Sequence, residues 1–217
     1  MSRAIAIMGE SGSGKTTAMR TLNPDETYYI DCDGKGLSWK GWRNQYNAEK
    51  KNYLRTDNQN DVLAVMRGIS DKRPNIKNIV IDTINSIMIA DERRRQAEKN
   101  YDKWADLAWS IYGIIDYCLE MRDDLTVVLI AHVQLDRDDD GYKFAHIKTS
   151  GKKLDKIGIE TKLTSVLYSK AIPDGENTRY IFETRAMNST AKTPRGAFEN
   201  LEIPNDICAV IKKLEEY

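Results

Sequence analysis

The sequence predicts an α/β fold, in which a central, mostly parallel sheet is flanked by helices and an antiparallel hairpin lies near the C-terminus. Short apolar runs at 4–8, 79–81 and 125–131, the last with one threonine, are typical of parallel strands buried on both faces. Stretches with apolar residues three or four positions apart lie between these runs and indicate helices. Two strand-like segments, 165–171 and 179–186, flank a Pro-Asp-Gly turn and favour an antiparallel pair.

Length and composition indicate a single domain over residues 1–217. The formal net charge is zero, so no overall basic field points to nucleic acid, although a local basic strip is compatible with this balance. The three cysteines have no paired spacing, which fits a reducing compartment. Because no apolar run reaches membrane-spanning length and no signal peptide precedes the first strand, we expect a cytoplasmic protein without a membrane partner.

The N-terminal part alternates expected strands and helices. A strand begins at Arg3, and a helix-compatible stretch follows at 16–22 before a proline-containing break. A second strand is expected at 27–31, and a helix at 61–69, where apolar residues recur at helical spacing. The aromatic- and lysine-rich stretch 38–53 has no clear period, and we expect a loop with a short helix there.

The rest of the chain continues this alternation as far as the hairpin. A buried strand ends in a carboxylate, and the helical region after it shows one clear apolar face in its second half. The elements expected there, besides the hairpin, are a strand at 78–83, an interrupted helical region at 85–122, a strand at 125–131, a polar stretch at 136–149, a short helix at 152–163, a loop at 189–196 and a helix at 205–216.

One motif near the N-terminus carries the most specific chemistry. Residues 9–16 match the pattern G-x-x-x-x-G-K-[ST] in full, between an expected strand and an expected helix. Glycines in such a loop let backbone N–H groups turn toward the β- and γ-phosphates of a nucleotide, and the helix N-terminus adds its positive end. The expected nucleotide-binding residues are Gly9, Glu10, Ser11, Gly12, Ser13, Gly14, Lys15, Thr16 and Thr17. The motif predicts a protein that binds a nucleoside triphosphate, and we expect ATP.

A magnesium ion is expected beside this loop. Lys15 would contact the β/γ oxygens, and the hydroxyl of Thr16 would bind Mg²⁺. Asp82 ends an apolar strand, which in a doubly wound sheet places its carboxylate next to the loop, where it can hold the metal or its water. An aspartate that caps the following helix is the alternative, but the motif favours the metal role.

Hydrolysis also needs a group that orients or deprotonates the attacking water. Asp31 and Asp33 both leave the strand 27–31, and we select Asp33 because it lies beyond the strand end, beside Gly34, where the loop can bring it to the nucleotide. From the residues alone, a solvated aspartate in a turn is nearly as good an interpretation.

Three further residues are candidates for the catalytic set. His132 follows the strand 125–131 and would touch the γ-phosphate, although a histidine satisfied by local hydrogen bonds explains it about equally well. Lys192 and Arg195 share a loop, and a cation from a neighbouring subunit can neutralise the transition state of phosphoryl transfer. Spacing alone favours a solvated charged turn for these two.

Taken together, these segments resemble the RecA-like ATPase core. The segment 29–33 resembles the RecA-family strand that ends in a catalytic acid, and Asp33 falls on that position, where RecA carries glutamate. Asp82 is similar to the family's metal-binding aspartate, and His132 falls where RecA and the DnaB helicases carry a γ-phosphate-sensing glutamine. The segment 191–196 resembles the Lys-x-Arg-x-Gly hairpin that DnaB-type cores insert into the neighbouring subunit's site, with a proline added.

The resemblance runs from about residue 3 to residue 196 and is strongest to the phage-encoded RecA-like single-strand annealing ATPases of the Sak group. Membership would imply a weak, DNA-stimulated ATPase that uses Mg²⁺, binds single-stranded DNA and acts in annealing or recombination. It would also imply a homo-oligomer, either a ring or a filament, that cooperates with a single-strand binding protein in the host cytoplasm.

DNA would then bind two loops that face the central axis in RecA-like cores, here 89–102 and 134–153. Both carry basic residues interleaved with aromatic ones, which suits a single strand because phosphates take the charge and bases stack on rings. These residues are Arg93, Arg94, Arg95, Lys99 and Tyr101 in the first loop and Arg137, Tyr142, Lys143, Phe144, His146, Lys148, Lys152 and Lys153 in the second. Four aspartates in the second loop, at 136 and 138–140, would repel a DNA backbone.

Three other functions stay open. A nucleotide-switched binding module would use ATP only to order its loops for a partner protein. A DnaB-like helicase core is ranked lower because the sequence contains no further domain that would couple to a fork. A small-molecule kinase requires an arginine-rich lid over the phosphates, and the stretch 134–153 contains one arginine.

Overall fold

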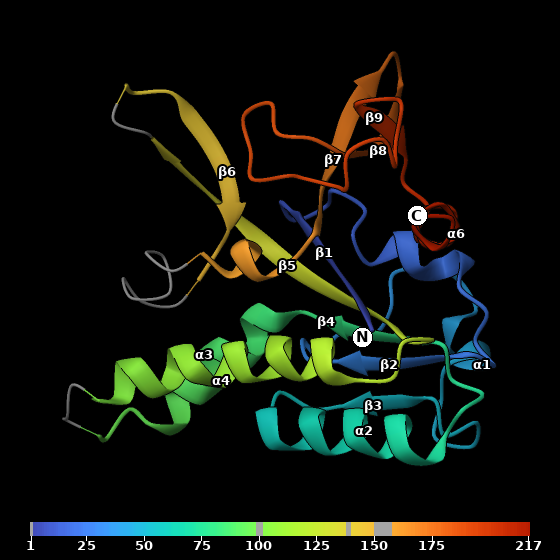
Figure 1. Cartoon of the computed structure of the whole chain (residues 1–217), viewed down its shortest axis with the longest axis vertical. Coiled ribbons are helices and arrows are strands. Elements are labelled where there is room, and N and C mark those ends of the chain that lie inside the picture. The colour runs from blue at the N-terminus through green and yellow to red at the C-terminus, as the bar shows by residue number, and fades with distance from the viewer. Residues whose placement is uncertain (1, 99–101, 138–139, 150–157) are drawn as a thin grey trace.

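A computed structural model of the chain describes residues 2–98, 102–137, 140–149 and 158–217. In this part of the chain, nine strands form one sheet in the order β3-β2-β4-β5-β1-β7-β8-β9, and β6 pairs with β5 off this path (Figure 1). The strands are β1 (Arg3–Gly9), β2 (Thr27–Asp31), β3 (Tyr53–Arg55), β4 (Asn78–Asp82), β5 (Thr126–Arg137), β6 (Lys143–Ile147), β7 (Ser165–Asp174), β8 (Asn177–Glu183) and β9 (Glu202–Pro204). The helices are η1 (Thr17–Thr21), α1 (Trp42–Gln45), α2 (Gln59–Lys72), α3 (Ile84–Arg94), α4 (Asp102–Glu120), η2 (Ile159–Lys162) and α6 (Ile207–Glu215), of which η1 and η2 are 3₁₀ helices.

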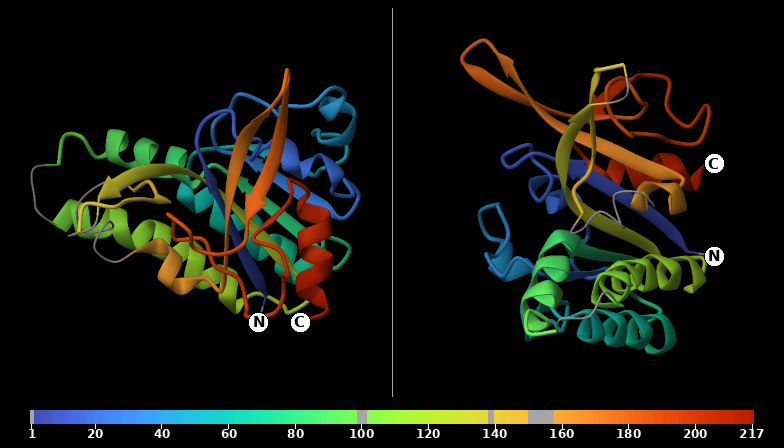
Figure 2. Two further views of the ribbon diagram at one scale, coloured as in Figure 1. Left: turned by 90° about the horizontal axis from the view of Figure 1, so that it is seen from above. Right: turned by 90° about the vertical axis from the view of Figure 1, so that its left-hand side faces the viewer.

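The sheet is parallel from β3 to β7 and is covered on both faces. Alternate residues of β1 point to opposite sides, so Ala6 and Met8 pack against α2, α3 and α4, whereas Ile5 and Ile7 pack against η1 and α6 (Figure 2). The side chains of all four β1 residues are fully buried. This arrangement confirms the expected α/β class with a mostly parallel central sheet.

Strand register brings the polar strand ends to one edge of the sheet. Asp31 lies opposite Asp82 in the β2–β4 pair, and Gly9 lies opposite His132 in the β1–β5 pair. Because parallel strands place their carboxyl ends on the same side, residues that are far apart in the chain converge there.

The expected antiparallel hairpin is present as β7 and β8, with β9 beside β8. Its turn lies at Gly175 and Glu176, just after the proline, and Gly175 has the left-handed φ of 62° that a tight turn requires. The last helix begins after Asp206, whose carboxylate accepts hydrogen bonds from the backbone N–H groups of Cys208 at 2.9 Å and Ala209 at 3.3 Å.

Two expected elements differ from the structure. The stretch 16–22 forms only the short 3₁₀ helix η1, and the chain turns to an extended conformation at Leu22, shortly before Asn23, where Pro24 disfavours a helical conformation. The polar stretch 136–149 is not a loop: β5 continues to Arg137 and β6 returns antiparallel to it. Within the expected short helix at 152–163, the described residues form η2 from Ile159, and 152–157 lie outside the described residues.

We call the projecting β5–β6 hairpin, residues 133–147, the arm. Its base is anchored because Ala145 donates its N–H to Asn188 O at 2.8 Å, and its carbonyl accepts from Thr190 N at 2.9 Å. Ile147 N donates to the buried carboxylate of Glu160 at 2.7 Å. The alternation of buried Ala145 and Ile147 with more exposed neighbours is the strand signal that the charged composition hides.

No helix within the described ranges has both the length and the apolar character that a membrane-crossing segment needs.

Candidate nucleotide-binding site

The loop between β1 and η1 has the backbone conformation that its glycines allow. Gly12 and Gly14 adopt left-handed φ values of 81° and 90°. A Cβ atom at Gly14 would lie 2.8 Å from Tyr180 Cδ1, and one at Gly9 would lie 2.6 Å from the carbonyl oxygen of Ser169. Larger residues are therefore excluded at both positions by close packing against the C-terminal hairpin.

Lys15 is folded back onto its own loop. Its ammonium group donates to the carbonyl oxygens of Gly9 at 2.8 Å and Glu10 at 2.7 Å, and the residue is 6% exposed. Burial lowers the pKa of Lys15 to about 8, although the nearby carboxylate of Asp82 favours the charged form. A buried ammonium group held by two neutral carbonyls is stabilised further by any anion that enters the loop.

This pKa leads to a measurable proton uptake on nucleotide binding. The positive charge of Lys35 also lowers the pKa of Lys15, whereas the carboxylates of Asp82, Asp33 and Glu10 raise it. At pH 8 an anionic polyphosphate raises the pKa of Lys15, so binding should take up about half a proton. Calorimetric titrations with ATP in buffers of different ionisation enthalpy, without added Mg²⁺, measure this number.

The same titration at pH 6.5 is the control, because Lys15 is already protonated there and uptake by this residue should vanish. Neutral His132 does not interfere at pH 8, since burial and the charge of Lys15 keep its pKa below the usual value. Identical apparent enthalpies in all buffers at pH 8 would contradict the expected uptake.

Thr16 and Asp82 meet at the loop. The Thr16 hydroxyl donates to Asp82 Oδ2 at 2.7 Å, and Tyr29 Oη donates to the same oxygen at 2.7 Å. The other carboxylate oxygen, Asp82 Oδ1, is buried and accepts no hydrogen bond from any residue that the structure describes. Burial raises the pKa of Asp82, while the bonds from Tyr29 and Thr16 oppose that shift.

These two side chains fit a magnesium ion. Mg²⁺ takes oxygen ligands and is commonly held by one or two protein groups together with substrate phosphates and water. Among the described residues, no group of three or more His, Cys, Asp or Glu side chains is arranged to hold a metal by itself. A metal at Thr16 and Asp82 therefore depends on phosphate oxygens for its remaining ligands.

Asp33 lies behind the wall of the site and is strongly hydrogen-bonded. Its Oδ1 accepts from Thr83 Oγ1 at 2.9 Å and Ser86 Oγ at 2.5 Å, and Lys35 Nζ donates to its Oδ2. Burial alone raises the pKa of Asp33, but these three donors outweigh it and lower the pKa to about 2. Asp33 is thus ionised at neutral pH and, in this arrangement, a weak proton acceptor.

Asp31, the other aspartate considered for orienting the water, has a structural role. Its carboxylate accepts hydrogen bonds from the backbone N–H groups of Gly34 and Gly36, each at 2.8 Å, and from Tyr53 Oη at 2.7 Å. These contacts hold the loop that carries Asp33 and occupy both oxygens of Asp31.

A cavity of about 270 Å³ at the edge of the sheet brings Lys15, Thr16 and Asp82 together, whereas Asp31 and Asp33 do not line it. It is lined by Ser11, Gly12, Ser13, Gly14, Lys15, Thr16, Thr17, Lys35, Ser38, Asp82, Thr83, His132 and Tyr180. A second cavity, of about 380 Å³, shares Gly14, Thr17 and Tyr180 with the first and extends to Arg20, Pro204, Asn205 and Asp206. Gly9 and Glu10 contribute through the carbonyls that hold Lys15, and Glu10 also lines a third cavity beside β7. The shared residues make the first two cavities neighbours along one side of the loop.

His132 lies on the cavity wall, but it does not end its strand. It marks the point where β5 leaves the parallel sheet and enters the arm. Its backbone N–H donates to Asn85 Oδ1 at 2.7 Å, and Asn85 Nδ2 donates to Lys148 O at 2.7 Å. Asn85 thereby connects the wall of the cavity to the segment just beyond the arm.

Lys192 and Arg195 do not line the described cavity around Lys15. The backbone of Lys192 exchanges hydrogen bonds of 2.7 and 2.8 Å with Val166, near the start of β7. Arg195 is exposed, and its carbonyl accepts from the Tyr217 hydroxyl. Their expected role in a neighbouring subunit's site stays a prediction.

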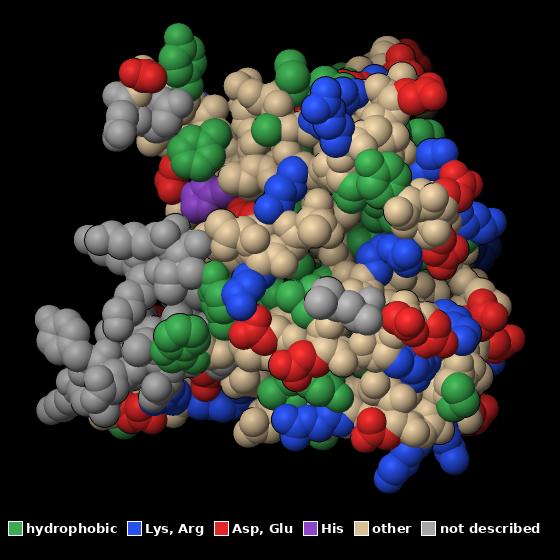
Figure 3. Space-filling view, in the orientation of Figure 1, with side chains coloured by type: hydrophobic (Ala, Val, Ile, Leu, Met, Phe, Trp, Pro, Cys, Tyr) green, Lys and Arg blue, Asp and Glu red, His purple; other side chains and the backbone are tan. Residues whose placement is uncertain are grey.

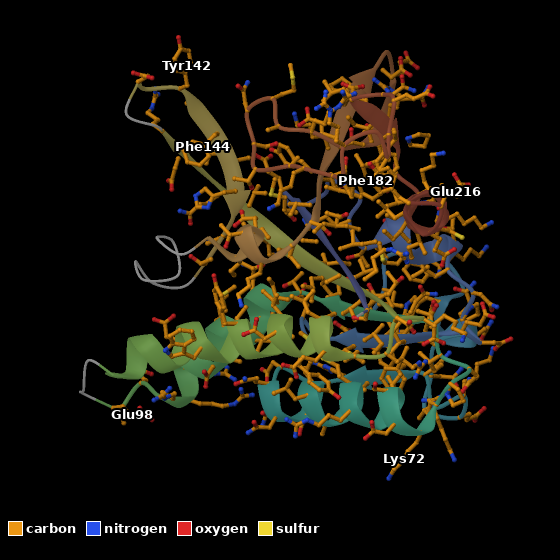
Figure 4. The ribbon with its side chains drawn as sticks, viewed as in Figure 1. Lys72, Glu98, Tyr142, Phe144, Phe182 and Glu216 are labelled. Carbon is orange, nitrogen blue, oxygen red and sulfur yellow. The ribbon has the colours of Figure 1, made fainter. Side chains whose placement is uncertain are left out.

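The two segments expected to bind DNA have different structures. In the first, Arg94 pairs with Asp57 and Arg95 pairs with Glu98, while Lys99 and Tyr101 lie outside the described residues. The second forms the arm, where Tyr142 is 71% exposed at the tip and Phe144 stacks on His146 (Figure 4). Lys152, Lys153, Asp138 and Asp139 lie outside the described residues. Figure 3 shows hydrophobic, acidic and histidine side chains interspersed on the arm.

Four residues that line the cavity were not predicted from the sequence: Lys35, Ser38, Thr83 and Tyr180. For Lys35, the available signal was its place between two glycines and two residues after Asp33. Tyr180 reaches the cavity only through the pairing of β8 with β7, which puts it opposite Ala171. No local pattern marks such a residue.

Comparisons with known proteins identify the family and the fold of the chain. A family model described as an AAA domain matches residues 1–194. A KaiC-like protein from the hyperthermophilic archaeon Pyrococcus horikoshii OT3 is 15% identical with a TM-score of 0.51, over 85% of this chain and 79% of that one. The flagellar accessory protein FlaH from Methanocaldococcus jannaschii is 14% identical with a TM-score of 0.51, over 93% and 83%. These two structures share the fold, and a search of curated proteins found no match.

Proposed function

Because the chain belongs to the AAA-domain family and has a RecA-like P-loop ATPase core, we propose that it hydrolyses ATP with Mg²⁺ and acts on single-stranded DNA. One observation carries the proposal for ATP. Lys15, Thr16 and Asp82 line one cavity, where a buried carboxylate oxygen of Asp82 has no hydrogen-bond partner among the described residues. A hydrated cation held by Asp82 beside a polyphosphate would supply this oxygen with a partner.

The loop would bind the triphosphate through its backbone N–H groups, and Lys15 would exchange the carbonyls of Gly9 and Glu10 for phosphate oxygens. Thr16 and Asp82 would hold Mg²⁺, which neutralises charge on the β- and γ-phosphates when bound. His132, neutral at pH 7, would donate a hydrogen bond to the γ-phosphate from the cavity wall.

In the chemical step, the oxygen of a water forms a bond to the γ-phosphorus, and the bond between that phosphorus and the β–γ bridging oxygen breaks. Asp33 would accept a hydrogen bond from the water and orient it. The water's proton passes to Asp33 or to the departing phosphate, and ADP leaves with the bridging electron pair. Asp33 would act mainly by orienting the water rather than by accepting its proton, because its carboxylate is a weak base in the present arrangement.

The second cavity would take the base of the nucleotide. Tyr180 lies against Gly14 and is 45% exposed, so one face of its ring is available to an adenine ring. Pro204 and Arg20 line the same space. Because every base can stack on an aromatic ring, this cavity would contribute to nucleotide affinity but would discriminate little between adenine and other bases.

Replacing Tyr180 with alanine should weaken binding of a non-hydrolysable ATP analogue about tenfold, which is the usual cost of losing one base–aromatic stack. Fluorescence titration measures this, and Tyr180→Phe should keep wild-type affinity. Tyr142→Ala is the matched control, because this tyrosine lies at the tip of the arm. Equal affinities for Tyr180→Ala and wild type would place the base elsewhere.

The arm supports the proposal for single-stranded DNA. It projects from the sheet and carries Arg137 and Lys143 as a cross-strand pair, with Tyr142 and Phe144 beside them. Asp136, which would repel DNA, accepts hydrogen bonds from Gln134 at 2.9 Å and His146 at 2.8 Å. Basic and aromatic side chains on a projecting hairpin suit phosphate contact and base stacking.

We further propose annealing or recombination of phage DNA by a homo-oligomer, a ring or a filament, together with a single-strand binding protein. Lys192 and Arg195 would enter the neighbouring subunit's site. Turnover per protomer should then rise with protein concentration, and Arg195→Ala should lower it without changing ATP affinity. Orthophosphate release over a dilution series checks this, with exposed Arg185→Ala as control. A rate per protomer that is flat across dilution contradicts the shared site.

The proposed function is tested by orthophosphate release with and without a short oligonucleotide, at several salt concentrations. Stimulation by single-stranded DNA that fades as salt rises, and that Tyr142→Ala reduces, supports it. Phosphate transferred to a nucleoside would indicate a kinase instead. Tight ATP binding with no release in any condition would indicate a nucleotide-switched binding module.

A further inference from the structure

Lys35 connects two parts of the site. Its ammonium group donates to Asp33 Oδ2, and its side chain lines the cavity that contains Lys15 and Thr16. We propose that Lys35 gates the water-orienting carboxylate: it pairs with Asp33 in the empty site and moves to the γ-phosphate of a bound triphosphate, which releases Asp33. This inference rests on the proposed function, because it requires a nucleoside triphosphate in the cavity.

The backbone around Lys35 is held by hydrogen bonds, whereas its side chain is largely exposed. Gly34 and Gly36 flank it with left-handed φ values of 68° and 79°, and the N–H groups of both glycines donate to Asp31. A Cβ atom at Gly34 would lie 2.4 Å from Arg55 Nε, so this turn requires glycine. The side chain of Lys35 is 55% exposed. Its ammonium group can therefore change partners without a change in the loop.

Asp33 cannot follow Lys35 into the cavity. Thr83 and Ser86 donate to its Oδ1 from the end of β4 and the start of α3, and its side chain is 11% exposed. Lys35 is the remaining donor, on Oδ2. When Lys35 leaves, Oδ2 becomes available to a water, and the carboxylate loses one of the three donors that lower its pKa.

The charges favour an exchange that depends on the third phosphate. Lys35 and Lys15 line the same cavity, so an anion bound there can be attracted by both ammonium groups. A terminal phosphate carries more negative charge than one carboxylate and attracts Lys35 more strongly. A diphosphate lacks this group, so Lys35 would stay on Asp33. The gate would thus distinguish ATP from ADP before any bond is broken.

The first test compares nucleotides. Lys35→Gln should weaken binding of a non-hydrolysable ATP analogue about tenfold and leave ADP affinity unchanged, because a charged hydrogen bond to the third phosphate is lost. Lys35→Arg should restore most of the discrimination. Lys40→Gln, at an exposed lysine of the same segment, is the matched control. An unchanged ratio of the two affinities in Lys35→Gln overturns the proposal.

The second test separates a gate from simple charge repulsion. Asp33→Asn should bind the ATP analogue several times more tightly than wild type, because Lys35 no longer has to leave a carboxylate. The gain should vanish when Lys35→Gln is also present. A gain of the same size in both backgrounds reflects repulsion alone and overturns the gate. If the wild type binds neither the ATP analogue nor ADP, the proposed function itself fails. This result can be told apart from the outcomes above, in all of which the wild type binds nucleotide.

Discussion

Asp33→Asn is expected to lower kcat for ATP hydrolysis by about 10² to 10³, because the attacking water loses the carboxylate that orients it. The variant should fold normally, since an amide oxygen at this position can still accept from Thr83 and Ser86. Nucleotide affinity should not fall. Steady-state orthophosphate release, together with a binding titration, measures both quantities.

Asp57→Asn serves as the control for this prediction. Asp57 pairs with Arg94 and lines a small cavity together with Asp33, so its replacement removes a nearby negative charge without touching the proposed water. Its kcat should stay within about twofold of wild type. Turnover by Asp33→Asn within threefold of wild type would remove Asp33 from the mechanism and leave the water-orienting residue unassigned.

Lys15→Ala should weaken ATP binding at least about 100-fold, since a buried ammonium group that contacts the phosphates is lost. In the absence of nucleotide, the melting temperature should change little, because the substitution also removes a charge whose burial is unfavourable. The upward shift in melting temperature that ATP causes in wild type should therefore disappear.

Lys213→Ala, at an exposed lysine paired with Glu216, is the matched control and should keep the ATP-dependent shift. If Lys15→Ala keeps the full shift, the loop does not bind the phosphates. If the variant unfolds at room temperature without nucleotide, the contacts of Lys15 with Gly9 and Glu10 are structural instead.

The parallel core could be predicted because its central strands contain continuous apolar runs. The apolar runs in β1, β4 and β5 must be buried on both faces, and a central strand of a parallel sheet provides such burial. Alternate residues of these strands accordingly lie in two core clusters, one on each face of the sheet. The strands β3 and β9 have three residues each and carry no period, so they depend on neighbours for their existence. The arm was missed because its charged composition suggested a loop.

The candidate site was predictable where it follows from strand ends. Thr16 and Asp82 were expected to meet because parallel strands end on one side of the sheet, and they lie within a hydrogen bond of each other. The pairing of Lys35 with Asp33 depends on two left-handed glycines and on Asp31, which no spacing rule describes. The position of Tyr180 depends on hairpin register, where a shift by one residue would turn its ring away.

The direct test of the central claim is a crystal structure with Mn²⁺ and a non-hydrolysable ATP analogue, with the metal located by its anomalous scattering. We predict one peak between the Thr16 hydroxyl, the unpaired oxygen of Asp82 and the phosphates, with Lys15 released from Gly9 and Glu10. A nucleotide bound elsewhere, or a metal that contacts neither Thr16 nor Asp82 while Lys15 keeps its carbonyl partners, would contradict the account.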